Sequence, residues 1–274
     1  MCLYNGEEFL EKSLKSLLRL DYQNYEIIIL DNQSTDTSLQ IVQRFMKYDH
    51  RIKLYVDTKR RNGYDGYTEI LKYCTGDFII NFNDDDFIAH NALNELYAEL
   101  IKTNSDGVFA NGFFMDREEN ILSKFFKFKL DFNSLNKKKQ ILLFYRLRFN
   151  VPFLFGLFRK NKILKLLPYE NIDQTLQDTD TLFSAKIISN LNIRYLDKNL
   201  HYYRQYPDHE RWHDPKHGSL DYLNSFKTLL LFQFRHELLL FKKFSILINE
   251  FSLSLFFFYF YNLIKKLYMI FRNI

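Results

Sequence analysis

Short apolar runs separated by amphipathic segments constrain how the first 115 residues can fold. The runs cover residues 25–30, 51–56, 78–82 and 107–114. The first of them, YEIIIL, is typical of a strand that is buried on both faces. Amphipathic segments alternate with the runs, and in residues 7–20 the apolar positions recur at helical spacing on one face (Leu10, Leu14, Leu17 and Leu18). This alternation predicts an α/β fold with crossover helices.

The pattern is looser after residue 115, and residues 119–140 have no clean period. We expect a strand over 153–160, a helix over 178–190 and two further strands over 193–197 and 200–206. The basic run Lys137–Lys139 is expected to be a solvated surface. The 274 residues suffice for one large domain, which we place at 1–217, and a helical extension at 218–274.

Three consecutive carboxylates follow the apolar run 78–82. Asp84, Asp85 and Asp86 would lie beyond the carboxyl end of a buried strand, where open α/β sheets bind ligands. Adjacent carboxylates repel one another unless a hard cation neutralises them, and Mg²⁺ and Mn²⁺ prefer such oxygen ligands. The alternative is a polar turn in which Asp86 caps the next helix.

Three weaker signals accompany this loop. Asp31 and Asn32 end the run 25–30 in the same way, although both residue types also favour turns for local reasons. Asp178 lies at the start of a predicted helix, where the helix dipole alone would stabilise it. Arg204 precedes a His-rich loop, which suggests a phosphate clamp or a metal ligand, with a solvated loop as the alternative.

Taken together and in order, these segments resemble the family 2 glycosyltransferases with the GT-A fold. The resemblance covers about residues 2–210 and rests on LYNGEEFLEKSLKSLL, YEIIILDNQSTDTS, TGDFIINFNDDDFI, GLFRK, QDTDTLF and YYRQYPD. It implies a Rossmann-like, mostly parallel central sheet flanked by helices. Residues 1–115 would form the nucleotide-binding half and residues 116–217 the acceptor-binding half.

The resemblance also implies a role for each residue that matches a family motif. Asp178 would be the catalytic base and Asp85 the ligand of a divalent cation, Mn²⁺ or Mg²⁺. The nucleotide sugar would be bound by Cys2, Tyr4, Asn5, Asp31, Asn32, Asn83, Asp84 and Arg204. The implied reaction is sugar transfer with inversion at the anomeric carbon.

Several positions depart from the family pattern. Asn32 and Asn83 replace acids, Gln177 replaces a Glu and Tyr206 stands where a His is common. An acid or an amide carbonyl still accepts the N3–H of uracil or thymine, which favours a UDP- or dTDP-sugar. None of these changes removes Asp85 or Asp178, so we expect an active enzyme.

The first residues also depart from the family. The loop at Tyr4–Asn5 normally follows a buried first strand, and here the chain starts at the end of that strand. We therefore expect an N-terminal truncation by the first strand, with unpaired backbone groups beside residues 26–30.

The tail from residue 218 is basic and aromatic. It holds seven Lys/Arg and three acids, a net charge of +4, and its apolar run 251–264 is too short to span a bilayer. Two interpretations stay open: a helix lying on an anionic membrane surface, and a helix packed on the core or on a second subunit as part of an oligomer. The two Cys make no metal or disulfide pattern and no signal peptide is visible, so we expect a cytoplasmic protein, peripheral at the inner face of the cell membrane.

We expect a transferase for bacterial surface polysaccharide, such as capsule, O-antigen or lipooligosaccharide, with a glycan or lipid-linked acceptor and no nucleic-acid partner. One alternative is a catalytically inactive nucleotide-sugar-binding relative that acts as a membrane-associated scaffold. Another is a nucleotidyltransferase, which would need a Gly-rich basic phosphate loop that the N-terminal sequence lacks.

Overall fold

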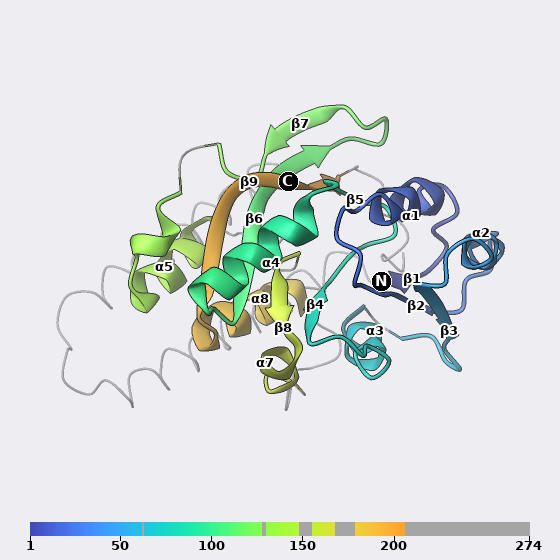
Figure 1. Cartoon of the computed structure of the whole chain (residues 1–274), viewed down its shortest axis with the longest axis horizontal. Coiled ribbons are helices and arrows are strands. Elements are labelled where there is room, and N and C mark those ends of the chain that lie inside the picture. The colour runs from blue at the N-terminus through green and yellow to red at the C-terminus, as the bar shows by residue number, and fades with distance from the viewer. Residues whose placement is uncertain (62, 128–129, 148–154, 168–178, 206–274) are drawn as a thin grey trace, which may run out of the picture. The chain divides into compact units, whose positions relative to one another are not determined.

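The computed structural model describes residues 1–205 apart from residues 62, 128–129, 148–154 and 168–178 (Figure 1). The predicted extension at 218–274, its boundary with the first domain and the predicted base Asp178 lie outside the described residues. Within the described part of the chain, no helix is long and apolar enough to cross a membrane.

The N-terminal part contains a three-stranded parallel sheet in the order β1-β2-β3. Its strands are β1 (Cys2–Leu3), β2 (Ile27–Asp31) and β3 (Ile52–Val56). Every residue of β2 is buried, as its unbroken apolar run predicts. Because parallel strands end at the same edge, the loops after β1, β2 and β3 lie together.

The second sheet has six strands and is mixed rather than mostly parallel. Its order is β4 (Phe78–Ile80), β8 (Leu157–Arg159), β6 (Gly107–Met115), β9 (Ile193–Arg204) and β5 (Phe87–Ile88), with β7 (Ile121–Lys124) paired to β6. The long strands β6 and β9 run parallel, whereas the other pairings in this sheet are antiparallel. Strand β9 joins the two segments that the sequence predicted separately.

Helices cover both sheets, which confirms the predicted α/β class (Figure 1). They are α1 (Leu10–Leu18), α2 (Ser38–Met46), α3 (Gly63–Ile70), α4 (Ala92–Thr103), α5 (Lys137–Leu147), α7 (Lys160–Leu164) and α8 (Thr179–Asn190), with a 3₁₀ turn at Phe132–Ser134. In α1 the leucines at 10, 14 and 17 are buried, as their spacing predicts. Helix α4 ends at Thr103, and the next residue, Asn104, adopts the left-handed conformation that commonly terminates helices.

Two cores hold these layers. The first is aliphatic and joins α1 and the parallel sheet to α4 and β6. The second is aromatic, and Phe109 lies at its centre with its ring in contact with Phe126, Phe132 and Tyr195. Much of the chain's high aromatic content is therefore used in packing β6 and β9 against the helices.

The two-residue β1 pairs with β2, so backbone groups of β2 that were expected to be unpaired have partners. Leu30 donates its N–H to the Met1 carbonyl (3.0 Å), Asn32 donates to Leu3 (2.7 Å) and the Met1 amine donates to Ile28 (2.9 Å). Burial lowers the pKa of that amine. Beside Met1, a cavity of about 580 Å³ lies between residues 26–28 at the start of β2 and residues 78–80 of β4. The two sheets share no backbone ladder there.

Candidate active site

Asp31 ends β2 with its side chain fully buried. Its Oδ2 accepts a hydrogen bond from the Ser34 N–H (3.1 Å), and its Oδ1 has no hydrogen-bond partner among the described residues. A buried acceptor without a donor costs free energy of about 1–3 kcal/mol. The Asp31 carboxylate is therefore suited to receive a donor from a ligand.

Asn32 fastens the loop that follows β3. Its Nδ2 donates to the Arg61 carbonyl (2.8 Å) and its Oδ1 accepts the Arg61 N–H (2.7 Å). Arg61 also forms ion pairs with Asp57 and Glu69. The predicted contact of Asn32 with a base stays a prediction, because its amide is engaged with the protein backbone here.

The loop after β1 meets the loop after β2 through short hydrogen bonds. Asn5 has a positive φ of 48° and accepts the Thr35 N–H on its Oδ1 (2.8 Å). The Asn5 N–H donates to Ser34 Oγ (3.0 Å), and the Gly6 N–H donates to Ser38 Oγ (2.8 Å). Because Ser34 also donates its N–H to Asp31, these bonds join the loop of Asn5 to the loop of Asp31.

Gly6 brings the acidic loop to the same place. A Cβ atom on Gly6 would lie 2.1 Å from Asp84 Oδ2, so only glycine permits this approach. The loops after β1 and β2 and the acidic loop after β4 therefore converge at Gly6, although residues 78 positions apart in the sequence must meet there.

Tyr4 and Cys2 flank this point. The Arg60 guanidinium lies 4.1 Å from the centroid of the Tyr4 ring, which is a cation–π contact. Cys2 packs against α3, where its Sγ would be 3.3 Å from a Cβ on Gly66. Burial raises the pKa of the Cys2 thiol, so the side chain stays neutral.

The three acids of the loop after β4 are all buried, with exposed fractions of 7% for Asp84, 5% for Asp85 and 0% for Asp86. Helix α4 starts at Ala92 with Asn91 before it, so the alternative in which Asp86 caps that helix is wrong. The acids lie instead in a loop held by distant parts of the chain.

Asp86 anchors this loop to β9. Its Oδ1 accepts the Arg204 N–H (2.9 Å), and its Oδ2 accepts Asn83 Nδ2 (3.1 Å) and lies 3.3 Å from His201 Nε2. Burial raises the pKa of Asp86 to about 7, against the lowering effect of the hydrogen bonds from Arg204 and Asn83. Burial also lowers the pKa of His201 to about 3, so this imidazole is neutral. The contact between Asp86 and His201 is therefore a buried hydrogen bond to a neutral imidazole and not an ion pair.

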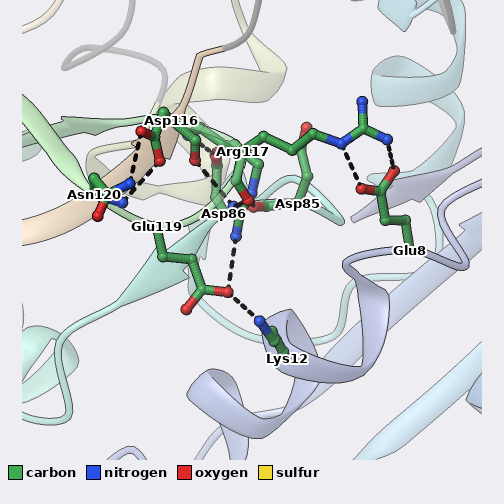
Figure 2. A network of polar contacts seen from close by, with 9 residues as sticks. Glu8, Lys12, Asp85, Asp86, Asp116, Arg117, Glu119 and Asn120 are labelled. Carbon is green, nitrogen blue, oxygen red and sulfur yellow. Dashed lines mark hydrogen bonds and ion pairs between the residues drawn. The ribbon is translucent and has the colours of Figure 1, made fainter.

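Arg204 occupies the centre of a polar network above the acidic loop. Its Nε donates to the Asp85 carbonyl (3.0 Å), and its Nη1 donates to the carbonyls of Asp116 (3.1 Å) and Arg117 (2.6 Å). Figure 2 shows this region, where Arg117 pairs with Glu8 and Glu119 pairs with Lys12. The predicted contact of Arg204 with a diphosphate stays a prediction, and the hairpin residues 116–120 had no signal in the sequence.

The acidic loop fits a divalent cation that shares its ligands with a substrate. Among the described residues, no group of three or more His, Cys, Asp or Glu side chains is arranged to hold a metal. Mg²⁺ is commonly bound by one or two carboxylates, with substrate phosphates and waters as the other ligands. Asp84 and Asp85, adjacent and nearly buried at the end of a strand, supply such a partial ligand set.

A family model described as glycosyl transferase family 2 matches residues 1–164. The GalNAc(5)-diNAcBac-PP-undecaprenol beta-1,3-glucosyltransferase of Campylobacter jejuni is 31% identical over 160 residues, which is 58% of this chain and 50% of that protein. The UDP-Glc:alpha-D-GlcNAc-diphosphoundecaprenol beta-1,3-glucosyltransferase WfgD of Escherichia coli is 30% identical over 108 residues, 39% of this chain and 42% of that protein. The aligned part thus spans half or less of these relatives.

Solved structures resemble the fold. TarS 1-349 of S. aureus in complex with UDP-GlcNAc superposes with a TM-score of 0.60 at 21% identity, covering 75% of this chain and 57% of that one. The mannosyltransferase PcManGT from Pyrobaculum calidifontis, in complex with GDP-Man and Mn²⁺, gives a TM-score of 0.51 at 14% identity, covering 73% of this chain and 54% of that one. At these identities the likeness concerns the fold alone.

Proposed function

The chain belongs to glycosyl transferase family 2, and from this premise we propose that it transfers a sugar from a nucleotide-sugar donor to an acceptor hydroxyl with inversion. The observation that carries the proposal is the convergence at Gly6, where Asp84 meets the loops that hold Asn5 and Asp31. One elongated ligand can contact both acidic ends of this site.

The unpartnered Asp31 Oδ1 supports binding of the nucleoside on the β2 side. It can accept the N3–H of uracil or thymine, which favours a UDP- or dTDP-sugar, with Tyr4, Cys2 and Asn32 around the base. The UDP and UDP-GlcNAc complexes of TarS agree with this choice. Asn83 and Asp84 would then face the ribose.

The diphosphate would lie beside Asp85. That carboxylate would hold a Mn²⁺ or Mg²⁺ ion, which when bound would supply Lewis-acid stabilisation of negative charge on the leaving group. Burial of the three acids excludes water around the leaving group and strengthens electrostatic interactions there.

Asp178 is the proposed base. It would remove the proton of the acceptor hydroxyl while the hydroxyl oxygen forms a bond to the anomeric carbon and the bond to the diphosphate oxygen breaks. Attack and departure on opposite faces of the sugar give inversion. This carboxylate immediately precedes α8, which begins at Thr179.

The acceptor would be a glycan or a lipid-linked glycan of a bacterial surface polysaccharide. Both relatives described above carry undecaprenol-linked acceptors in their names. A lipid-linked acceptor would place the enzyme at the inner face of the cell membrane, with the basic residues 218–274 as the proposed contact to that surface or to a second subunit.

A donor panel tests the proposal. Purified protein with Mn²⁺ or Mg²⁺ should release nucleoside diphosphate from at least one UDP-, dTDP-, GDP- or CDP-sugar, and Asp178→Asn should keep donor binding and lose transfer. Binding of a donor without turnover by the wild type would support the inactive scaffold instead. Absence of binding to every donor in calorimetry would refute the nucleotide-sugar site.

A further inference from the structure

We infer that Arg204 is a positioning residue. It fixes the backbone of the acidic loop, which carries the proposed metal ligand Asp85, and joins this loop to the hairpin 116–120. The inference deepens the proposed function, because it concerns how Asp85 is oriented toward a cation and a diphosphate. It starts from the burial of the Arg204 side chain, which is 0% exposed.

A guanidinium is buried only when its donors and its charge are compensated. Nε and Nη1 of Arg204 donate to three backbone carbonyls, and Nη2 lies 3.6 Å from Glu119 Oε1 without a hydrogen bond. The guanidinium carbon also lies 4.2 Å from the centroid of the Phe9 ring and 5.1 Å from that of Phe87. The guanidinium thus contacts two rings, and its Nε and Nη1 are directed at the backbone.

Arg204 contacts two successive residues of the acidic loop. Its Nε donates to the Asp85 carbonyl, and its backbone N–H donates to Asp86 Oδ1. The backbone that directly follows the Asp85 side chain is therefore fixed by one residue of β9. Fixing that backbone limits the directions in which the Asp85 carboxylate can point.

The same guanidinium holds the hairpin between β6 and β7. Its Nη1 donates to the carbonyls of Asp116 and Arg117, and ion pairs join the hairpin to Glu8, just before α1, and to Lys12 within α1 (Figure 2). Arg117 donates to both oxygens of Glu8 (2.7 and 2.6 Å), and Lys12 pairs with Glu119. Glu8 directly follows the loop at Asn5–Glu7 that borders the proposed nucleotide site. Arg204 thereby links the proposed nucleotide and metal ends of the site.

Lysine cannot reproduce this arrangement, because its single ammonium cannot present donors from two separated nitrogens in the fixed plane of a guanidinium. Arg159 offers a matched control. It also donates to a backbone carbonyl, that of Ser105 (3.0 Å), and lies 5.5 Å from the Phe78 ring, and within the described part of the chain its polar contacts lie away from the acidic loop.

The test compares Arg204→Gln with Arg159→Gln by UDP titration with and without Mn²⁺. We expect Arg204→Gln to lose about tenfold or more of the gain in UDP affinity that Mn²⁺ provides, as for outer-shell residues of metal sites. UDP affinity without metal should stay within about twofold, and Arg159→Gln should change neither value. A folded Arg204→Gln protein that keeps the full Mn²⁺-dependent gain overturns the inference.

Two further measurements keep the inference testable. If Arg204→Gln does not fold, Arg204→Lys replaces it, and an undiminished Mn²⁺-dependent gain in that variant overturns the inference equally. Hydrogen exchange of the backbone amides of residues 83–86 and 116–120 can be measured without a ligand. Faster exchange in the Arg204 variant but not in Arg159→Gln supports the positioning role of Arg204. If the wild type binds no UDP, the proposal that the donor is a UDP-sugar fails. Equal hydrogen exchange in the two variants would separately reject the positioning role of Arg204.

Discussion

The loops after β2 and β4 both place acids at the end of a buried strand, yet they are held in different ways. The β2 loop is fastened by the N-terminal part of the chain, since Asp31 accepts from Ser34 and Asn32 pairs with Arg61 in the loop after β3. The β4 loop is fastened by β9, with Asp86 in contact with His201 and Arg204. The first loop thus depends on assembly of the parallel sheet, whereas the second depends on assembly of the second sheet.

The two loops also differ in how many hydrogen-bond partners their buried carboxylates have. Asp31 is buried with one oxygen unpartnered among the described residues, whereas both oxygens of Asp86 are engaged. A carboxylate oxygen without a donor can accept a hydrogen bond from a ligand, whereas a carboxylate with donors on both oxygens stabilises the fold. We therefore propose a recognition role for Asp31 and a supporting role for Asp86, with Asp85 as the proposed cation ligand.

The largest effect is expected for Asp85→Asn, which removes the charge proposed to bind the cation. We expect sugar transfer to fall at least about 100-fold, beyond the 10–100-fold range of outer-shell changes. Steady-state release of nucleoside diphosphate measures this loss, and Asp21→Asn, an exposed acid between α1 and β2, is the matched control. Near-normal sugar transfer by Asp85→Asn would contradict a role of the β4 loop in catalysis.

A pair of alanine variants tests the contrast in stability. Asp86→Ala should lower the free energy of unfolding by about 3 kcal/mol, because it leaves buried donors of Arg204 and Asn83 without their acceptor. Asp31→Ala should cost about 1 kcal/mol, because one hydrogen bond from Ser34 is lost and an unpartnered oxygen is removed. Urea denaturation compares them, and equal losses would contradict the proposed division between support and recognition.

The recognition role of Asp31 makes a separate prediction about affinity. In Asp31→Asn, UDP affinity should fall about tenfold if the amide turns its NH₂ group toward the uracil N3–H, at a cost of about 1.4 kcal/mol. Calorimetry with UDP in the absence of metal isolates this end of the site. Unchanged affinity would mean that the base is bound elsewhere.

The smallest effect is expected at Glu26, which lies at the opposite end of β2 from both loops. Although partial burial raises its pKa, hydrogen bonds from Lys53 and Thr75 lower the pKa to about 2. A depressed carboxyl pKa contributes stability that is present above the unfolded value of about 4.5 and is lost as the pH falls toward 2.

Glu26→Gln should therefore lower the free energy of unfolding by about 1 kcal/mol at pH 7, after allowance for solvent screening, and by little near pH 2. Thermal unfolding across this range measures the difference. UDP affinity should stay unchanged, and a loss of affinity equal to that of Asp31→Asn would contradict the separation of fold and site along β2.

The strands and acids that could be predicted from sequence are those with local signals. The run 25–30 and the leucines of α1 show their burial through spacing alone, and acids at the ends of apolar runs mark the edge of the sheet. Strand β9 was predicted as two strands, 193–197 and 200–206, which excluded Lys198 and Asn199, and the first of them ended at the polar Asp197. In the structure these polar residues lie at a register irregularity opposite Ala110–Asn111.

The features that the sequence could not predict depend on contacts between residues far apart in the chain. Lys137 was expected to be solvated, but its Nζ donates to the carbonyls of Ile188 (3.0 Å) and Leu191 (2.5 Å) at the end of α8. The contacts of Arg204 with the acidic loop join residues 118–119 positions apart, so no local pattern could reveal them. Such partners are fixed by the sheet topology and become visible only in the folded chain.

The central claim is that the two loops bind the two ends of one nucleotide sugar. A crystal structure of the protein with UDP and Mn²⁺, with the metal located by its anomalous scattering, tests it most directly. The account predicts Mn²⁺ on the Asp85 carboxylate with diphosphate oxygens, and the uracil N3–H donating to the Asp31 carboxylate. A diphosphate bound away from Asp85, or a base that makes no contact with Asp31, would contradict it.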